Sequence, residues 1–324
     1  MKRWTCFLFT ISLFSPALAT DWEKYPDTLP VFNYEGDKLK QHWDALTSIS
    51  HVEYPDTDWL KGMVERYPRL AYTMVTLSAE KNVHPAVFAA IHDSNFDPLA
   101  YEIQQVWRLH FEGKFEEAYE HGMQLGPLGK IPAIYSRLSH ASLLINDTKD
   151  KFEEFEAAAN QSNEGLTIVP DYSFAQFGLV YARVRTLELM DTGEARSSGY
   201  ISFSQEELEK LQKRFPERAI YYATQGGLEA GIVERVGSFL GSITYGATKS
   251  SSIEAFDSAL KLTADVPVIY NEYAVALSRL DKKDFRKDIK KILQTCTQLN
   301  PMSAEEALNQ MHCQSMLKQS NKDD

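Results

Sequence analysis

The sequence has 324 residues, of which 24% are charged and 44% are hydrophobic, and its formal net charge is −11. A chain of this length can bury a large hydrophobic core, so the composition favours a globular protein. The acidic excess argues against binding to nucleic acids or to anionic membranes, because both require basic surfaces.

The first 19 residues are typical of a secretory signal peptide. Lys2 and Arg3 precede a short apolar run, which ends in an Ala-x-Ala motif at Ala19. This pattern predicts cleavage between Ala19 and Thr20. The alternative is an uncleaved anchor, but the run is too short to cross about 30 Å of hydrocarbon. We therefore expect a periplasmic or secreted protein with no stable membrane insertion after cleavage, carrying 45 acids against 32 bases.

Residues 20–97 are predicted to form an N-terminal helical region that begins with an extended lead-in over residues 20–36. The next apolar residues, Leu39, Trp43 and Leu46, recur at the spacing of one helical face. Further short helices are expected as far as residue 97, interrupted by prolines that stop one helix and start the next.

Residues 98–190 are predicted to form helical hairpins, the first of them over residues 98–125. Gly113 permits the reversal of the backbone between the two helices. We expect Phe115 to fill the joint and Ala118 to let the helices touch. The segment therefore predicts a unit of a stacked array, an architecture that presents surfaces to partners.

Residues 191–203 are rich in glycine and serine, which predicts a linker between two sets of hairpins. Residues 204–324 are predicted to form the second set, starting from a capping box at Ser204. The spacing of Gly237 and Gly241 predicts a close helix contact. No sustained alternation of apolar and polar residues occurs, so the predicted class is all-α.

Helix pairs of this kind resemble the tetratricopeptide repeat in a degenerate form. The segment from Gly113 to Ala118 matches the turn and the entry to the second helix, and Phe256 and Ala259 match the end of a second helix. Longer blocks resemble secreted bacterial tetratricopeptide-like proteins of poorly defined role. The resemblance implies antiparallel helical hairpins stacked as a solenoid, with a protein or peptide partner in the cell envelope.

In such a solenoid the first helix of each pair lines a concave face, where Tyr, Arg and Asn side chains suit the capture of a peptide or a small anion. The candidate residues for this groove are Tyr181, Arg183, Arg185, Tyr221, Tyr222, Tyr245, Tyr270, Asn271 and Tyr273. The alternative is that these tyrosines fill the seams between helices and bond a partner through the hydroxyl.

Two cysteines, Cys296 and Cys313, remain after the predicted cleavage. An oxidising compartment favours a disulfide between them. If residues 300–302 form the turn between two antiparallel helices, however, the two positions are offset by roughly 10 Å along the helix axes, beyond the ~7 Å limit for a bridge. The sequence leaves this candidate disulfide open.

Residues 83–98 resemble the catalytic helix of soluble lytic transglycosylases, with Asp93 in place of the catalytic glutamate. That chemistry needs a long carboxylic acid in an apolar cleft. Because Asp93 is one methylene shorter, a helix that simply ends there is the simpler interpretation. His84 and His92 do not make a metal site by themselves, and we expect no cofactor.

The sequence thus favours an exported scaffold that binds a protein or peptide and is not an enzyme. The alternatives are an accessory solute-binding or ligand-binding subunit of an envelope transport system and, more remotely, a peptidoglycan-cleaving enzyme. Loss of muropeptide release in Asp93→Asn would support the last of these.

Overall fold

A computed structural model describes residues 22–322, so the signal peptide predicted over residues 1–19 lies outside the described residues. Within that range the chain contains helices and no strand, which confirms the predicted all-α class. None of the helices in residues 22–322 has the length and apolar character needed to cross a membrane.

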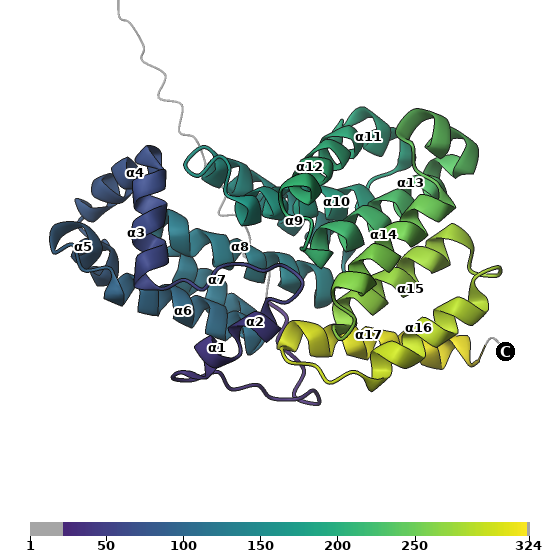
Figure 1. Ribbon diagram of the computed structural model, residues 1–324, viewed down its shortest axis with the longest axis horizontal. Coiled ribbons are helices and arrows are strands. Elements are labelled where there is room, and N and C mark those ends of the chain that lie inside the picture. The colour runs from purple at the N-terminus through teal and green to yellow at the C-terminus, as the bar shows by residue number, and fades with distance from the viewer. Residues whose placement is uncertain (1–21, 323–324) are drawn as a thin grey trace, which may run out of the picture.

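Figure 1 shows an elongated molecule with the early helices at one end and the late helices at the other. The helices of the first end are α1 (Lys38–Gln41), α2 (Trp43–Leu46), α3 (Thr57–Arg66), α4 (Pro68–Ser78), α5 (Pro85–His92), α6 (Asp97–Phe111) and α7 (Phe115–Met123). Asp56 caps α3 by accepting the backbone N–H of Trp59, and prolines start α4 and α5, where the missing N–H costs nothing.

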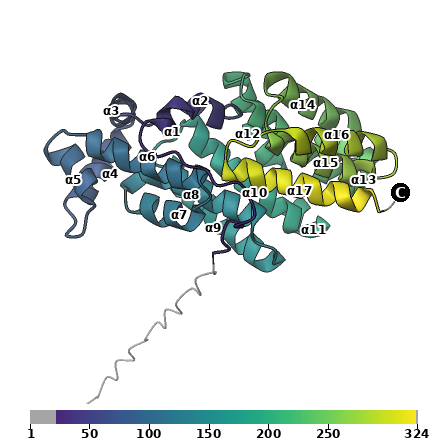
Figure 2. The ribbon, with the colours of Figure 1, turned by 90° about the horizontal axis from the view of Figure 1, so that it is seen from below.

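The remaining helices are α8 (Gly126–Leu143), α9 (Thr148–Leu166), α10 (Ser173–Leu189), α11 (Thr192–Ser197), α12 (Tyr200–Arg214), α13 (Ala219–Tyr245), α14 (Lys249–Leu262), α15 (Pro267–Asp281), α16 (Arg286–Gln298) and α17 (Ala304–Ser320). Consecutive helices pack against each other, as in the pairs α7–α8, α9–α10, α13–α14 and α15–α16. The last helix, α17, crosses back and packs against α6 and α8, which Figure 2 shows from below.

The turn at Gly113 joins α6 to α7 as predicted. Gly113 has a φ of +83°, a conformation that L side chains rarely adopt, and Ala118 is fully buried. Phe115 is also buried, but its cluster includes Ala304 and Leu308 of α17 as well. The turn therefore joins α6 to α7 and also contacts the last helix, α17.

The N-terminal segment (residues 22–36) precedes the first helix and packs beside the α6–α7 turn and the start of α17. Trp22 and Tyr25 pack against the cluster formed by Phe115 and the start of α17. The backbone N–H of Tyr34 donates to Glu112 Oε1 at 2.9 Å, and its hydroxyl donates to the carbonyl of Met302. The segment thus connects the α6–α7 turn to the entry of α17.

Two main hydrophobic cores fill the molecule, and they meet at α10. The buried residues of the first core lie in the sequence between Tyr34 and Ala175, and those of the second lie between Phe177 and Cys313. The predicted linker at residues 191–203 is wrong as a boundary, because Ala195 and Ile201 are buried in the second core. This segment forms α11 and the first turn of α12, and glycine and serine occur in it as cap and turn residues.

Two further local predictions are corrected. Ser204 does not start a helix, because α12 begins four residues earlier, directly after Gly199 with a φ of +75°. Gly237 does not mediate helix packing either. It has a φ of +79° and a ψ of 159°, which places a kink inside α13.

Cys296 and Cys313 form a disulfide with their Cα atoms 6.3 Å apart. The predicted offset between the two cysteines along the helix axes was wrong, because it was based on a tight turn between the two helices. The connection between α16 and α17 instead contains extended residues at Leu299 and Ser303, which carry the chain farther than a tight turn would before α17 begins.

The close approach of α13 and α14 takes place at Gly226. A Cβ atom at this position would lie 2.6 Å from the ring of Phe256, whereas a Cβ at Gly227 would meet nothing within 4 Å. We expect Gly226→Ala to lower the free energy of unfolding by about 1–3 kcal/mol through overpacking. The matched change Gly227→Ala should raise it by up to about 1 kcal/mol through helix propensity. Urea denaturation of both variants tests this contrast, and equal effects would contradict it.

Candidate functional site

The predicted groove residues do not line one common surface. Tyr221, Asn271 and Tyr273 are buried, with 1%, 5% and 8% of their surface exposed. The Asn271 side chain donates to Asn309 Oδ1 at 2.9 Å, and the ring of Tyr273 stacks on Phe256. These three predictions are corrected: the side chains fill seams between helices, which was the alternative interpretation.

Three other predicted groove residues are also engaged within the protein. Arg183 forms an ion pair with Glu156 at 2.5 Å and lies over the ring of Tyr200. The hydroxyl of Tyr270 donates to the carbonyl of Ala264 at 2.8 Å. Tyr222 packs in part against the second core. These contacts within the protein therefore stabilise the fold.

Tyr245 is the last residue of α13, beyond the kink. Its ring packs in part against the second core, and its backbone carbonyl accepts a hydrogen bond from the Gln205 side chain at 2.8 Å. It therefore ties the end of α13 to α12.

Tyr181 and Arg185 do lie together, in a charge network between α10 and α15. Arg185 donates to the Tyr181 hydroxyl at 3.0 Å, to Glu188 at 2.9 Å and to Glu272. Arg279 donates to the second oxygen of Glu188 at 2.8 Å. The side chains of these four charged residues are between 14% and 24% exposed, so the network is shielded from solvent on most sides.

The electrostatics of this network favour the charged forms of Arg185, Glu188 and Arg279. Burial acts to raise the pKa of Glu188, but Arg185 and Arg279 outweigh it and lower that pKa to about 2. Burial acts to lower the pKa of Arg185, yet Glu188 and Glu272 hold it well above its ordinary value. Since each charge already has a partner, we interpret the network as a tie between helices.

A larger apolar pocket, the α4–α10 pocket, lies between α4, α8, α9 and α10. It encloses about 970 Å³ of empty space, including the solvent at its open side. The lining residues are Thr73, Leu77, Met123, Pro127, Lys130, Ile131, Ile134, Tyr135, Gln161, Ser162, Glu164, Gly165, Ile168, Val169, Phe174, Ala175 and Gly178. Ile134 and Phe174 are buried in its floor, whereas Lys130 and Glu164 are exposed at its rim.

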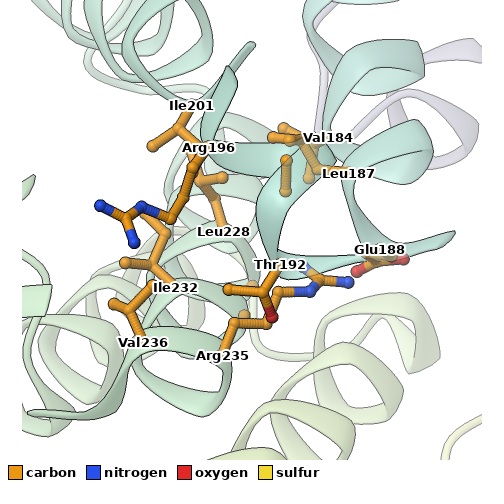
Figure 3. A pocket seen from close by; sticks show the side chains of 13 residues that line it. Val184, Leu187, Glu188, Thr192, Arg196, Ile201, Leu228, Ile232, Arg235 and Val236 are labelled. Atoms are coloured by element: carbon orange, nitrogen blue, oxygen red, sulfur yellow. The ribbon is translucent and has the colours of Figure 1, made fainter. Parts of the chain in front are cut away.

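A second apolar pocket, the α10–α13 pocket, lies between α10, α11, α12 and α13 (Figure 3). It encloses about 390 Å³, again counting its open side. The lining residues are Val184, Leu187, Glu188, Thr192, Ala195, Arg196, Ile201, Gly227, Leu228, Gly231, Ile232, Arg235 and Val236. Its walls are aliphatic, and the two arginines stand on different sides of it.

Sequence reasoning missed both pockets, although one signal was present. Glycines inside helices leave space where other residues would project a side chain. Gly165, Gly178, Gly227 and Gly231 are such glycines, and each lines one of the two pockets.

The residues considered for catalysis or metal binding do not line either of these pockets. Asp93 is the exposed C-cap residue of α5 and lies outside the apolar clefts described above. The rings of His84 and His121 are 6.0 Å apart, and His121 bonds Glu102 at 2.8 Å. Within residues 22–322, no group of three His, Cys, Asp or Glu side chains is placed to hold a metal ion.

No protein-family model, no curated protein and no solved structure matches this chain.

Proposed function

We propose that the protein is an exported helical scaffold that binds a protein or peptide partner in the cell envelope and catalyses no reaction. The observation that carries this proposal is the α4–α10 pocket, with its buried apolar floor and its charged rim. An apolar centre inside a polar rim is the anatomy of a protein-binding hot spot. A partner segment would insert apolar side chains between α4 and α10.

Export is supported by the signal-like sequence of residues 1–19 and by the disulfide between Cys296 and Cys313. Disulfides persist in oxidising compartments and are rare in the cytosol. Trp22 packs against His140, with ring centroids 4.3 Å apart, only three residues after the predicted cleavage point at Ala19. A chain cleaved there would begin close to its first anchored residue. This arrangement favours a periplasmic or secreted protein.

The resemblance to degenerate tetratricopeptide repeats also supports partner binding. The hairpin at Gly113 has the expected turn, and the helices pack in consecutive pairs. Stacked helical hairpins form an extended structure with a large exposed surface, and such surfaces serve mainly to bind partners. The arrangement therefore agrees with a scaffold.

A photoreactive residue placed at Lys130, on the pocket rim, tests this function in living cells. We expect it to cross-link one defined segment of an envelope protein, identified by mass spectrometry of the cross-linked peptide. Gly165→Phe should reduce the yield at least tenfold, because it fills the pocket from a position where a Cβ meets nothing within 4 Å.

The matched control is Gly62→Phe on α3, where a Cβ likewise meets nothing within 4 Å and the residue is exposed. This control should leave the cross-link intact. A cross-link that is absent, or equally strong in Gly165→Phe, would contradict the proposed site.

A second candidate function is an accessory solute-binding subunit, favoured by one observation. The cavity volume of the α4–α10 pocket, counted without the open solvent, is about 220 Å³, which is room for a small solute. Native mass spectrometry of the purified protein separates the two functions. A small molecule that is retained by the wild type and lost in Gly165→Phe would favour the solute-binding function.

A further inference from the structure

A polar pocket, the α6 pocket, lies between α6 and the residues that precede α3. Its cavity volume, counted without the open solvent, is about 410 Å³, which lies within the range of small-molecule sites. One wall comes from residues between Tyr34 and Leu39, another from Tyr54, and the third from α6. No residue lines both this pocket and the α4–α10 pocket, so the two sites are separate.

One face of α6 supplies a row of side chains to the pocket. The row consists of Tyr101, Gln104, Gln105 and Arg108. Residues three, four and seven positions after the first lie on the same side of a helix. The buried residues of α6, such as Val106, belong to the first core instead. The row therefore faces away from the core, and its polar and aromatic groups are available to a ligand.

Two tyrosine rings provide the apolar surface of the pocket. Tyr101 is 58% exposed, although it is a large aromatic residue. Tyr54 is half-buried and packs edge-on against Trp43, with the ring centroids 5.1 Å apart, so its ring is fixed in place. A tyrosine presents an apolar ring face and a polar hydroxyl to the same ligand. The pair suits a ligand that carries both C–H surface and hydroxyl groups.

The polar groups of the pocket include donors and acceptors that the fold does not use. The Tyr54 hydroxyl and the Asp37 carboxylate make no hydrogen bond with any residue from 22 to 322. Burial raises the pKa of Tyr54, and Asp56 and Asp37 add to the effect, so the hydroxyl stays protonated and can donate. The amide nitrogen of Gln104 donates to the carbonyl of Pro55 at 3.0 Å, which leaves the amide oxygen as an acceptor.

The charges at the pocket disfavour a charged ligand of either sign. Arg108 lies 3.8 Å from Glu35 and 3.6 Å from Glu112, so an anion would compete with these carboxylates for the guanidinium group. The ring of Tyr54 already has a cation over it, since Lys40 Nζ lies 5.6 Å from the ring centroid. A neutral ligand with many hydroxyl groups avoids both conflicts.

We propose that the α6 pocket binds a short neutral saccharide, with one sugar ring against Tyr101 and its hydroxyl groups bonded to Tyr54 and Asp37. A sugar combines a C–H face with hydroxyl groups that both donate and accept hydrogen bonds. One sugar ring can therefore use the aromatic face of Tyr101 and the unused polar groups together. The test of this site does not depend on the proposed protein partner, which would bind in the other pocket.

Saturation-transfer difference NMR of the purified protein with maltose, cellobiose, lactose and N,N′-diacetylchitobiose tests the proposal. We expect at least one of these neutral disaccharides to give a signal, strongest for the C–H protons on one face of a sugar ring. Isothermal titration calorimetry with that disaccharide should give one site per chain. Glucuronate and glucosamine, which carry a negative and a positive charge, should not displace it at equal concentration.

Two variants assign the binding to this pocket. Tyr101→Ala should weaken it at least tenfold, because it removes the exposed ring. Tyr54→Phe should weaken it about 3- to 10-fold, since it removes one hydroxyl and keeps the ring. Tyr72 on α4 supplies the matched controls, because it is 75% exposed and lines none of these pockets. Tyr72→Ala and Tyr72→Phe should leave the affinity unchanged.

The proposal is overturned if none of the four disaccharides binds, or if the charged sugars displace the bound disaccharide. It is also overturned if Tyr101→Ala binds as tightly as Tyr72→Ala. Circular dichroism establishes that each variant is folded. If Tyr101→Ala does not fold, the comparison of Tyr54→Phe with Tyr72→Phe decides the outcome.

Discussion

Replacing both Cys296 and Cys313 with alanine is expected to lower the free energy of unfolding by about 3 kcal/mol. The disulfide closes a loop between residues 17 apart, and a crosslink over a loop of about that length restricts the unfolded chain by roughly this amount. Cys296 and Cys313 are also fully buried, so the smaller side chains add a packing loss. Urea denaturation of the purified protein measures the difference.

A reductant provides the control for this prediction. Reduction should destabilise the wild type to a similar extent and leave the double alanine variant unchanged, because that variant has no remaining disulfide. If reductant changes neither protein, the bridge does not contribute to stability in solution. Single replacements are unsuitable for the test, since each leaves a free thiol.

The substitution Glu188→Gln should destabilise the protein by about 3–5 kcal/mol at pH 7. It removes the carboxylate that Arg185 and Arg279 share, and breaking a buried ion pair leaves a charge without compensation. The control is Glu209→Gln, which breaks an exposed pair with Lys213 and should have no measurable effect. Equal effects of the two substitutions would contradict the assignment of the network as a tie between helices.

The pH dependence of this effect has a definite sign. The pKa of Glu188 is about 2 in the folded protein, below its ordinary value of 4.5. Its contribution is therefore fully present above about pH 4.5 and is lost as the pH falls toward 2. The difference in stability between wild type and Glu188→Gln should narrow over that range. A constant difference from pH 7 to pH 2.5 would show that the carboxylate is not stabilised by its arginines.

The sequence was sufficient to predict an all-α chain with helices that begin at prolines and a turn at Gly113, because these signals are local. Pro68 and Pro267 sit in the first turn of α4 and α15, and Gly113 has the positive φ of the predicted turn. The boundary predicted at residues 191–203 failed because a run of small residues marks caps and turns as readily as a linker. Ala195 shows the difference, since its burial depends on contacts that no local pattern encodes.

The candidate site was less predictable than the helices. Tyr181 and Arg185 were predicted to line a groove for a partner, but they lie in a charge network, and the partners of Arg185 come from α10 itself and from α15, more than eighty residues away. Tyr221 and Tyr273 were selected for their residue type, and the fold buries both. A pocket depends on what several distant helices leave unfilled, so its position follows only from their packing.

The N-terminal segment has a consequence for the order of assembly. Residues 22–36 are synthesised early, yet part of the surface on which Trp22 and Tyr25 pack belongs to α17, near the other end of the chain. Until Ala304 and Leu308 are present, those aromatic rings lack part of their partner surface. The contact between the two ends of the described chain therefore forms last, and a chain that stops before α17 leaves the apolar side chains of residues 22–36 open to proteolysis.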